Sequence, residues 1–311
     1  MSTIAVKRIM RDYKSYQESD LSDTGIHCLM NEDDIYNMTA LIIGPKDTPY
    51  EGGFYFFNIR FPSNYPFKYP HVKFMTLNSA VRFNPNYYKC GKVCLSILGT
   101  WSGPGWTSVM NLSSVLLTLQ SRLNEMPFRN EPGYETDNSH LSLNYNKVLR
   151  YYNITVAVIQ MIRDTPCGFD IFKSIMNQEF IKNCPYYIKY IRDNIQNKGT
   201  TIKSSAFGMS VTINTEYLEK MIKDIYNTIN PKIAEKLEAE KSEAGKSEAV
   251  ITKKTPYVRK SPNDLAENYD LGIIKVSENN GKKYIVALRV NGTKFWKKYK
   301  ESKTPMSSNS T

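Results

Sequence analysis

Histidine is scarce in this sequence, and its cysteines form no regular framework. The 311 residues contain three histidines and five cysteines, an odd number that suits a reducing compartment better than a set of disulfides. The first residues lack the apolar core and cleavage site of a signal peptide, and no uncharged apolar run approaches membrane-spanning length. These absences predict a soluble intracellular protein, in the cytoplasm or the nucleus, with no membrane partner.

The scarcity of histidine limits what Cys94 can do. It lies in the segment RFNPNYYKCGKVCLSILGTW, where it could be a nucleophile, a metal ligand or a packed side chain. A hydrolytic cysteine usually has a histidine base, because little of an ordinary thiol is ionised near neutral pH. The nearest histidine, His71, lies 23 residues away in a predicted strand. Cys90 and Cys94 have no matching second pair of ligands, so we expect no metal site.

The other three cysteines have no motif around them. A free cysteine of this kind is by default a small buried hydrophobe. We therefore expect packing roles for Cys28, Cys167 and Cys184.

The charge of the chain is positive and unevenly distributed. The net charge is +11 at pH 7, and residues 251–311 hold thirteen Lys and Arg against five Asp and Glu. A basic tail can bind nucleic acid or an acidic protein surface, although a solubilising surface is the more common explanation.

Hydrophobic periodicity places strands first and helices after them. Residues 34–45, 52–62 and 71–77 read as strands, and their short connections imply an antiparallel meander. Apolar side chains three and four positions apart predict helices over 3–16, 111–123, 142–164, 169–184, 185–197 and 215–229. Residues 231–264 become rich in Lys, Glu, Ser and Pro, which predicts a fraying helix and then a linker.

The last part of the chain alternates again. Residues 271–299 contain three alternating segments separated by Asn-Gly pairs, which predicts a three-stranded meander. Its lysines interleave with Tyr284, Phe295 and Trp296, so the sheet could bind phosphates and stack on bases. Alternatively, these aromatic side chains cover the small core of the sheet itself.

Several motifs between residues 4 and 163 occur together in a recognisable order. They are GPKDTPYEGGFYFFNIRFPSNYPFKYPHVKF, then RFNPNYYKCGKVCLSIL, then a loop with tryptophan and a leucine-rich helix. In this order and at these spacings they resemble the catalytic core of ubiquitin-conjugating enzymes. The segments CLSILGTWSGPGW and NEPGYE, with the helices that follow, are most similar to the long branch of the family, which carries a C-terminal extension.

The resemblance implies an α+β fold with an N-terminal helix, a four-stranded antiparallel meander and C-terminal helices. A helical extension and a small β-rich tail module would follow this core. The predicted domains are a catalytic core at 1–165, a helical extension at 166–235, a flexible linker at 236–262, a small basic three-stranded module at 263–300 and a disordered tail at 301–311.

The resemblance also implies that Cys94 accepts ubiquitin, or a ubiquitin-like modifier, as a thioester and passes it to a substrate lysine or a ligase. Exchange between a thiol and a thioester replaces one sulfur leaving group by a similar one. The exchange is therefore nearly isoenergetic and can proceed without a dedicated base. Asn86 matches the asparagine of the family's His-Pro-Asn motif, and Asn84 stands at its histidine. Asn86 either stabilises an oxyanion or holds a turn. Glu131 best matches the acidic residue that assists the attacking lysine, with a solvated loop carboxylate as the alternative.

Docking surfaces of the family correspond to the first helix and two loops. Lys7 and Arg8 match the face that binds the activating enzyme, although charges on a helix are often only solvated. The loops that meet ubiquitin ligases correspond to Phe67 and to Trp106, Thr107, Ser108 and Val109. No cofactor is implied, because the upstream activating enzyme consumes the ATP, and the further partner is the protein substrate.

Two other classes of function are compatible with the sequence. A non-enzymatic adaptor with the same fold would bind ubiquitin or a ligase, but relatives of that kind usually lack the cysteine that is present here. A nucleic-acid-binding protein with a degenerate conjugating domain would act through residues 263–300 and would form no thioester.

Overall fold

The computed structural model describes residues 3–231, 268–269, 273–277, 282–288 and 294–298. The chain divides into two units, Met1–Ala239 and Glu240–Thr311. The predicted linker at 236–262 and tail at 301–311 lie outside the described residues. The domain boundaries predicted from the sequence stay a prediction.

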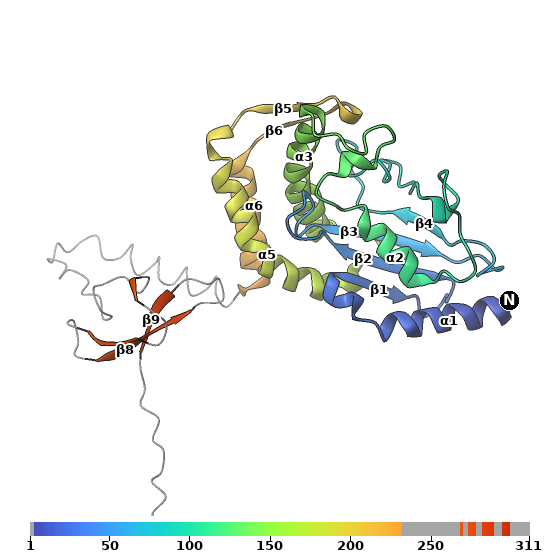
Figure 1. The fold of residues 1–311 in the computed structure, drawn as a ribbon, viewed down its shortest axis with the longest axis horizontal. Helices are drawn as coiled ribbons and strands as arrows, with labels where there is room; N and C mark the ends of the chain where they lie inside the picture. Colours follow the sequence, from blue (N-terminus) through green and yellow to red (C-terminus); the bar gives the residue numbers. More distant parts are fainter. Residues whose placement is uncertain (1–2, 232–267, 270–272, 278–281, 289–293, 299–311) are drawn as a thin grey trace, which may run out of the picture. The chain divides into compact units, whose positions relative to one another are not determined.

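The first unit begins with a helix and a sheet and ends with helices (Figure 1). The elements that build its core are α1 (Thr3–Gln17), β1 (Ile26–Met30), β2 (Asn37–Ile43), β3 (Phe54–Arg60), β4 (His71–Phe74) and α2 (Leu112–Ser121). The elements that follow are α3 (His140–Tyr152), the π-helix η4 (Asn153–Gln160), α4 (Met161–Arg163), α5 (Lys173–Asp193), β5 (Thr201–Ser204), β6 (Met209–Thr212) and α6 (Thr215–Ile229).

Strands β1 to β4 form one antiparallel sheet in sequential order, which confirms the predicted meander and the α+β fold. Hydrophobic periodicity alone located three of these strands and did not locate β1. In β1, Ile26 and Cys28 are buried, but Leu29 is 37% exposed and Met30 is only partly buried. Apolar residues therefore face both sides of β1, and the alternation on which strand prediction depends is lost.

Strand β3 is buried on both faces. Successive side chains of a strand point to opposite sides, so Tyr55 and Phe57 share one face and Phe56 lies on the other. The ring of Phe57 contacts that of Tyr87 at 5.3 Å, and the Tyr87 hydroxyl donates to the carbonyl of Leu119 in α2 at 2.6 Å. Helix α2 and the segment around Tyr87 therefore cover this face of the sheet (Figure 1).

The opposite face of β3 is covered by the residues that precede and form α5. Phe56 is fully buried, and its ring lies 4.8 Å from that of Phe169 and 6.4 Å from that of Phe172. The Tyr187 hydroxyl in α5 donates to the carbonyl of Gly52 at 2.8 Å, just before β3. The helical extension thus shares the hydrophobic core of the sheet.

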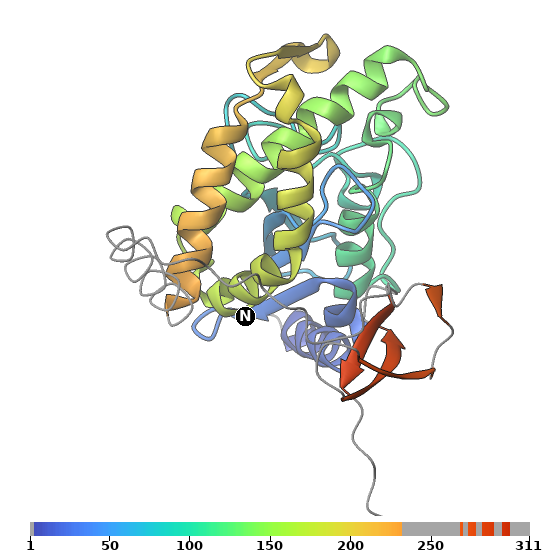
Figure 2. The same ribbon diagram turned by 90° about the vertical axis from the view of Figure 1, so that its left-hand side faces the viewer.

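The extension differs from the prediction in two places. Residues 169–184 and 185–197 were predicted as two segments, but α5 runs unbroken through Pro185. The hairpin of β5 and β6 was not predicted, because each strand has only four residues with few apolar side chains. Figure 2 shows α5 and α6 side by side, with this hairpin at one end of the two helices.

The second unit contains a three-stranded antiparallel sheet, as predicted, formed by β7 (Ile274–Val276), β8 (Lys283–Leu288) and β9 (Lys294–Lys298). Tyr284, Val286 and Trp296 are at most 9% exposed and form a small cluster with Tyr269. These aromatic side chains therefore pack into the core of the sheet. None of the described helices has both the length and the apolar character that a membrane crossing requires.

Replacing Phe172 by alanine is expected to destabilise the first unit by about 3–5 kcal/mol, because truncating a buried phenylalanine leaves a cavity. The neighbouring Ile171 is 57% exposed, so Ile171→Ala serves as the matched control and should change stability by no more than about 0.5 kcal/mol. Urea unfolding followed by circular dichroism measures both. Equal effects of the two substitutions would contradict the packing of the extension against β3.

Candidate functional site

The segment that carries Cys94 is a tight loop fastened to β4. Tyr87 pairs with Val93 across the loop, and the Phe74 amide donates to the carbonyl of Gly91 at 2.8 Å. Gly91 has φ +90°, and a Cβ at this position would lie 2.8 Å from the Phe74 carbonyl oxygen. Both facts require glycine here, so the turn that leads to Cys94 has a defined shape.

Asn86 and Cys94 are joined by two hydrogen bonds. The Asn86 side-chain amide donates to the carbonyl of Cys94 at 2.8 Å, and the Cys94 backbone amide donates to the carbonyl of Asn86 at 2.9 Å. This geometry supports the loop-holding alternative for Asn86. The amide nitrogen carries a second hydrogen, so the oxyanion role stays a prediction.

Asn84 is fully buried, and both ends of its side chain are engaged. Its amide nitrogen donates to the Tyr50 hydroxyl at 3.0 Å and to the carbonyl of Arg122 at 2.7 Å. Its oxygen accepts from the Asn86 backbone amide at 2.9 Å. Asn84 therefore ties the Cys94 loop to the end of α2.

The Cys94 side chain is covered in this structure. The residue is 3% exposed, and its thiol donates to the carbonyl of Thr100 at 2.9 Å. The Thr100 hydroxyl accepts from the Leu95 amide at 2.9 Å and donates to the carbonyl of Val93 at 2.8 Å. The sulfur is therefore closed to solvent in this conformation. Nothing in the local sequence marks Thr100 for this role.

Glu131 follows the short 3-10 helix η3 (Pro127–Asn130), and its backbone amide donates to the carbonyl of Phe128 at 3.0 Å. Glu131 is partly exposed, and its carboxylate forms no ion pair within the described part of the chain. No hydrogen bond joins it to Cys94 or Asn86, so its assignment to the site stays a prediction. Burial raises the pKa of nearby Tyr145 well above its ordinary value, an effect that Arg82 opposes and Glu131 reinforces.

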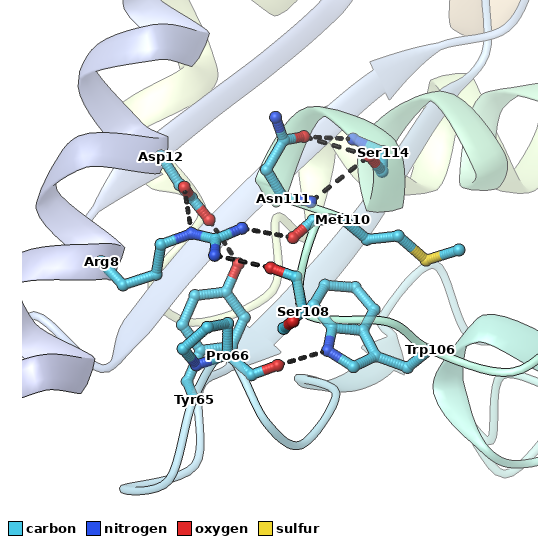
Figure 3. A network of polar contacts seen from close by, with 9 residues as sticks. All are labelled: Arg8, Asp12, Tyr65, Pro66, Trp106, Ser108, Met110, Asn111 and Ser114. Carbon is cyan, nitrogen blue, oxygen red and sulfur yellow. Dashed lines mark hydrogen bonds and ion pairs between the residues drawn. The ribbon is translucent and has the colours of Figure 1, made fainter.

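Arg8 holds the loop that precedes α2 (Figure 3). Its Nε contacts the Asp12 carboxylate at 2.7 Å, and its two terminal nitrogens donate to the carbonyls of Ser108 at 2.7 Å and Met110 at 2.5 Å. The Tyr65 hydroxyl donates to the second oxygen of Asp12. Arg8 is thus committed to an internal network. The spacing of Arg8 and Asp12, four residues apart on one helix, is the sequence signal for this pair.

The two predicted ligase loops lie next to each other. The Trp106 indole donates to the carbonyl of Pro66 at 2.7 Å, which joins the loops, as Figure 3 shows. Phe67 is 74% exposed and Val109 is 85% exposed, so apolar side chains of both loops face solvent. The other candidates, Lys7, Thr107 and Ser108, are also exposed. The docking roles of all these residues, and of Arg8, stay predictions.

Metal ligands are not gathered anywhere in the described residues: no group of three or more His, Cys, Asp and Glu side chains is close enough to hold an ion.

An N-terminal helix, a four-stranded meander and a looped cysteine held by an asparagine together define the ubiquitin-conjugating class of fold. A family model described as ubiquitin-conjugating enzyme matches residues 8–164. The chain therefore belongs to the ubiquitin-conjugating enzyme family.

Individual relatives extend the similarity beyond this core. The chain is 43% identical over 205 residues to ubiquitin-conjugating enzyme E2 Z of Xenopus tropicalis. The matched residues make up 65% of this chain and 64% of that protein. It is 42% identical over 200 residues to E2 Z of Homo sapiens, covering 63% of this chain and 55% of the human protein. A probable ubiquitin-conjugating enzyme of Acanthamoeba polyphaga mimivirus is 36% identical over 195 residues, covering 58% of this chain and 13% of the relative. The chain spans less than two thirds of each of these proteins.

The five cysteines should react with iodoacetamide in an order set by their exposure. Cys90 and Cys167 are exposed, so Cys167 does not have the predicted packing role, and both should react before the covered Cys94. Burial raises the pKa of the Cys28 thiol and raises that of Cys184 from 9.0 to about 11. Each pKa unit is a tenfold change in the ratio of thiolate to thiol.

We therefore expect Cys28 and Cys184 to stay unmodified near neutral pH, and labelling of Cys184 to keep rising toward pH 11. Peptide mass spectrometry of timed samples measures the five rates. If Cys94 is modified as fast as Cys90, its thiol is not held against Thr100 in solution.

Proposed function

We propose that this protein accepts ubiquitin or a ubiquitin-like modifier as a thioester on Cys94 and transfers it to a substrate lysine or to a ligase. The observation that carries the proposal is a cysteine, Cys94, at the centre of a loop that the structure holds in place. Within the family-matched core, the cysteine stands in a loop whose shape is fixed by Asn86, Asn84 and Gly91. A non-catalytic adaptor would not need a thiol at this place.

The first step is an exchange between two sulfur leaving groups. The Cys94 thiolate attacks the thioester carbonyl that joins the modifier's C-terminal glycine to the activating enzyme. A new carbon–sulfur bond forms as the old one breaks, and the activating enzyme's cysteine leaves as a thiolate. Because the two thioesters are nearly equal in energy, the position of the equilibrium follows binding and concentration.

The second step is attack by a lysine amine, with loss of a proton from nitrogen and departure of the Cys94 thiolate. A substrate lysine is charged near neutral pH and must lose a proton before it can attack. The Glu131 carboxylate is the candidate acceptor. The second Asn86 amide hydrogen is the candidate donor to the oxyanion of the tetrahedral intermediate.

The proposed partners follow from these steps. They are the modifier, its activating enzyme, a ubiquitin ligase and the protein substrate, with the protein acting in the cytoplasm or the nucleus. Binding of nucleic acid by the basic sheet at 263–300 stays a prediction. Burial of Tyr284 and Trp296 leaves charge, not stacking on these rings, as the means by which the sheet could bind.

The proposal is tested by incubating the protein with ATP, ubiquitin and a panel of activating enzymes and resolving the products on a non-reducing gel. We expect an adduct that thiol reagents remove. Cys94→Ser should give a thiol-resistant ester or no adduct. Cys90→Ser is the matched control, because Cys90 is an exposed cysteine four residues away, and it should retain the adduct.

An adduct that persists in Cys94→Ser but disappears in Cys90→Ser would move the carrier role to Cys90. A folded protein that forms no adduct with any activating enzyme or modifier would favour the adaptor.

Glu131→Gln should slow discharge of the loaded protein to free lysine by about 10²-fold or more near neutral pH, because it removes the candidate proton acceptor. Loading by the activating enzyme should be unchanged. Glu135→Gln is the control from the same loop, where hydrogen bonds to its own backbone and to Gly133 lower the pKa of an exposed carboxylate. It should discharge at the wild-type rate. Single-turnover discharge followed by gel separates the two outcomes, and equal rates for both variants would remove Glu131 from the reaction.

A further inference from the structure

The turn of the β5–β6 hairpin contains one residue in an unusual conformation. Phe207, in the turn Ala206–Gly208, has φ +55° and ψ 19°, the left-handed region that disfavours residues with a side chain. Such a conformation persists only where the surrounding contacts hold it. The contacts of Phe207 therefore show what this turn does.

Phe207 forms one side of a stack around an arginine of the Cys94 segment. The Arg82 guanidinium carbon lies 4.1 Å from the centre of the Phe207 ring and 3.9 Å from that of Tyr88. A guanidinium between two aromatic faces gains cation–π attraction on both sides. The Arg82 backbone amide also contacts the Met209 sulfur at 3.1 Å. The extension and the Cys94 segment are thus joined at Arg82.

Arg82 transmits this contact to the residue before Asn86. One terminal nitrogen of Arg82 donates to the carbonyl of Pro85 at 2.5 Å. Pro85 is followed directly by Asn86, whose side chain holds the Cys94 carbonyl. Loss of the stack would release the guanidinium and with it the carbonyl that precedes Asn86.

The same ring of Phe207 also contacts the segment before Glu131. Its centre lies 6.0 Å from that of Phe128 and 5.7 Å from that of Tyr145, both in edge-to-face geometry. The Phe128 carbonyl accepts a hydrogen bond from the Glu131 backbone amide at 3.0 Å. The Tyr145 hydroxyl donates to the carbonyl of Arg82 at 2.8 Å. One side chain of the extension therefore touches the supports of both candidate catalytic loops.

Simple packing does not account for an arginine at this place. The Nε of Arg82 is buried and has no hydrogen-bond partner among the described residues, which opposes burial of the group. An apolar side chain would fill the space between the rings of Tyr88 and Phe207 without this cost. It would not reach the Pro85 carbonyl with a donor, and that bond is what the cation adds.

We propose that Phe207 and Arg82 are positioning residues that set the geometry of the two loops carrying Asn86 and Glu131. The hairpin of the extension is then part of the support of the active site. This inference rests on the proposed function for its kinetic consequence, whereas its structural consequence at Asn86 does not depend on ubiquitin.

The test compares three variants with a control. Phe207→Ala keeps the Cβ, and so the backbone strain, but removes the ring. Phe207→Tyr keeps the ring. Arg82→Lys keeps the charge but loses the planar group that stacks and donates sideways. Ile222→Ala is the control, because it truncates a residue of α6 that is 4% exposed and so weakens the extension at another place.

The first readout compares two rates for each variant. One is loading by the activating enzyme, and the other is discharge of the loaded protein to lysine at saturating lysine. Phe207→Ala and Arg82→Lys should slow discharge about tenfold or more while loading stays within about twofold, since misplacing a group by an ångström can cost a hundredfold. Phe207→Tyr, which keeps the ring, should discharge at the wild-type rate. Ile222→Ala should lower the melting temperature without changing discharge.

The second readout is the pair of side-chain amide resonances of Asn86, assigned by their loss in Asn86→Asp. They should shift and broaden in Phe207→Ala and stay in place in Ile222→Ala. Wild-type Asn86 resonances in Phe207→Ala, or wild-type discharge in that variant, would overturn the inference. If the wild-type protein forms no thioester, the proposed function fails, while the resonances still decide whether Phe207 positions Asn86.

Discussion

Burial of β3 on both faces is the constraint on which the first unit depends. Tyr55 and Phe57 meet the segment that leads to Cys94, and Phe56 meets Phe169 and Phe172 of the extension. A central strand with aromatic side chains on both sides requires a covering layer on each side. The site and the extension are therefore two layers on one sheet.

The site itself is held by bonds between segments far apart in sequence. Arg8 in α1 fixes the carbonyls of Ser108 and Met110, and Asn84 reaches the carbonyl of Arg122 at the end of α2. In each case a charged or amide side chain donates to backbone carbonyls that have no partner in a helix or strand. Giving such a carbonyl a hydrogen-bond donor fixes the path of an irregular segment. Loops held like this can present reactive groups at fixed places.

Elements that depend on neighbouring residues were predictable from the sequence, whereas those that depend on distant contacts were not. Elements with a clear period, such as α2 and β3, were predicted from local spacing, and the sheet order followed from short connections and the family resemblance. The hairpin of β5 and β6 was missed, since its four-residue strands carry too few apolar side chains to show a period. Residues 169–184 and 185–197 were predicted as two segments, and the second begins at Pro185. Proline disfavours the interior of a helix, but packing of α5 against the sheet overrides that preference.

The same distinction applies to the residues around Cys94. The motif with Asn86 and Cys94 was visible because its members lie eight residues apart in one quoted segment. The covering of the thiol by Thr100 depends on how a loop closes, and the stack at Arg82 depends on a residue 125 positions later. No local pattern encodes such contacts. The predicted docking role of Arg8 stays a prediction. In the structure its donors bond within the protein, and only Asp12 four residues on signals this in the sequence.

These supports hold the backbone of the Cys94 loop, whereas a single hydrogen bond holds the Cys94 side chain. The backbone around Cys94 is bonded to Asn86, to Thr100 and through Gly91 to β4. Turning the Cys94 side chain away from the Thr100 carbonyl breaks one weak bond from a thiol and disturbs none of the backbone bonds. The thiol is covered in this structure, and a rotation about its side-chain bond leaves the backbone of the loop in place. A fixed loop backbone and a cysteine side chain that can turn are thus compatible, because they rest on different atoms.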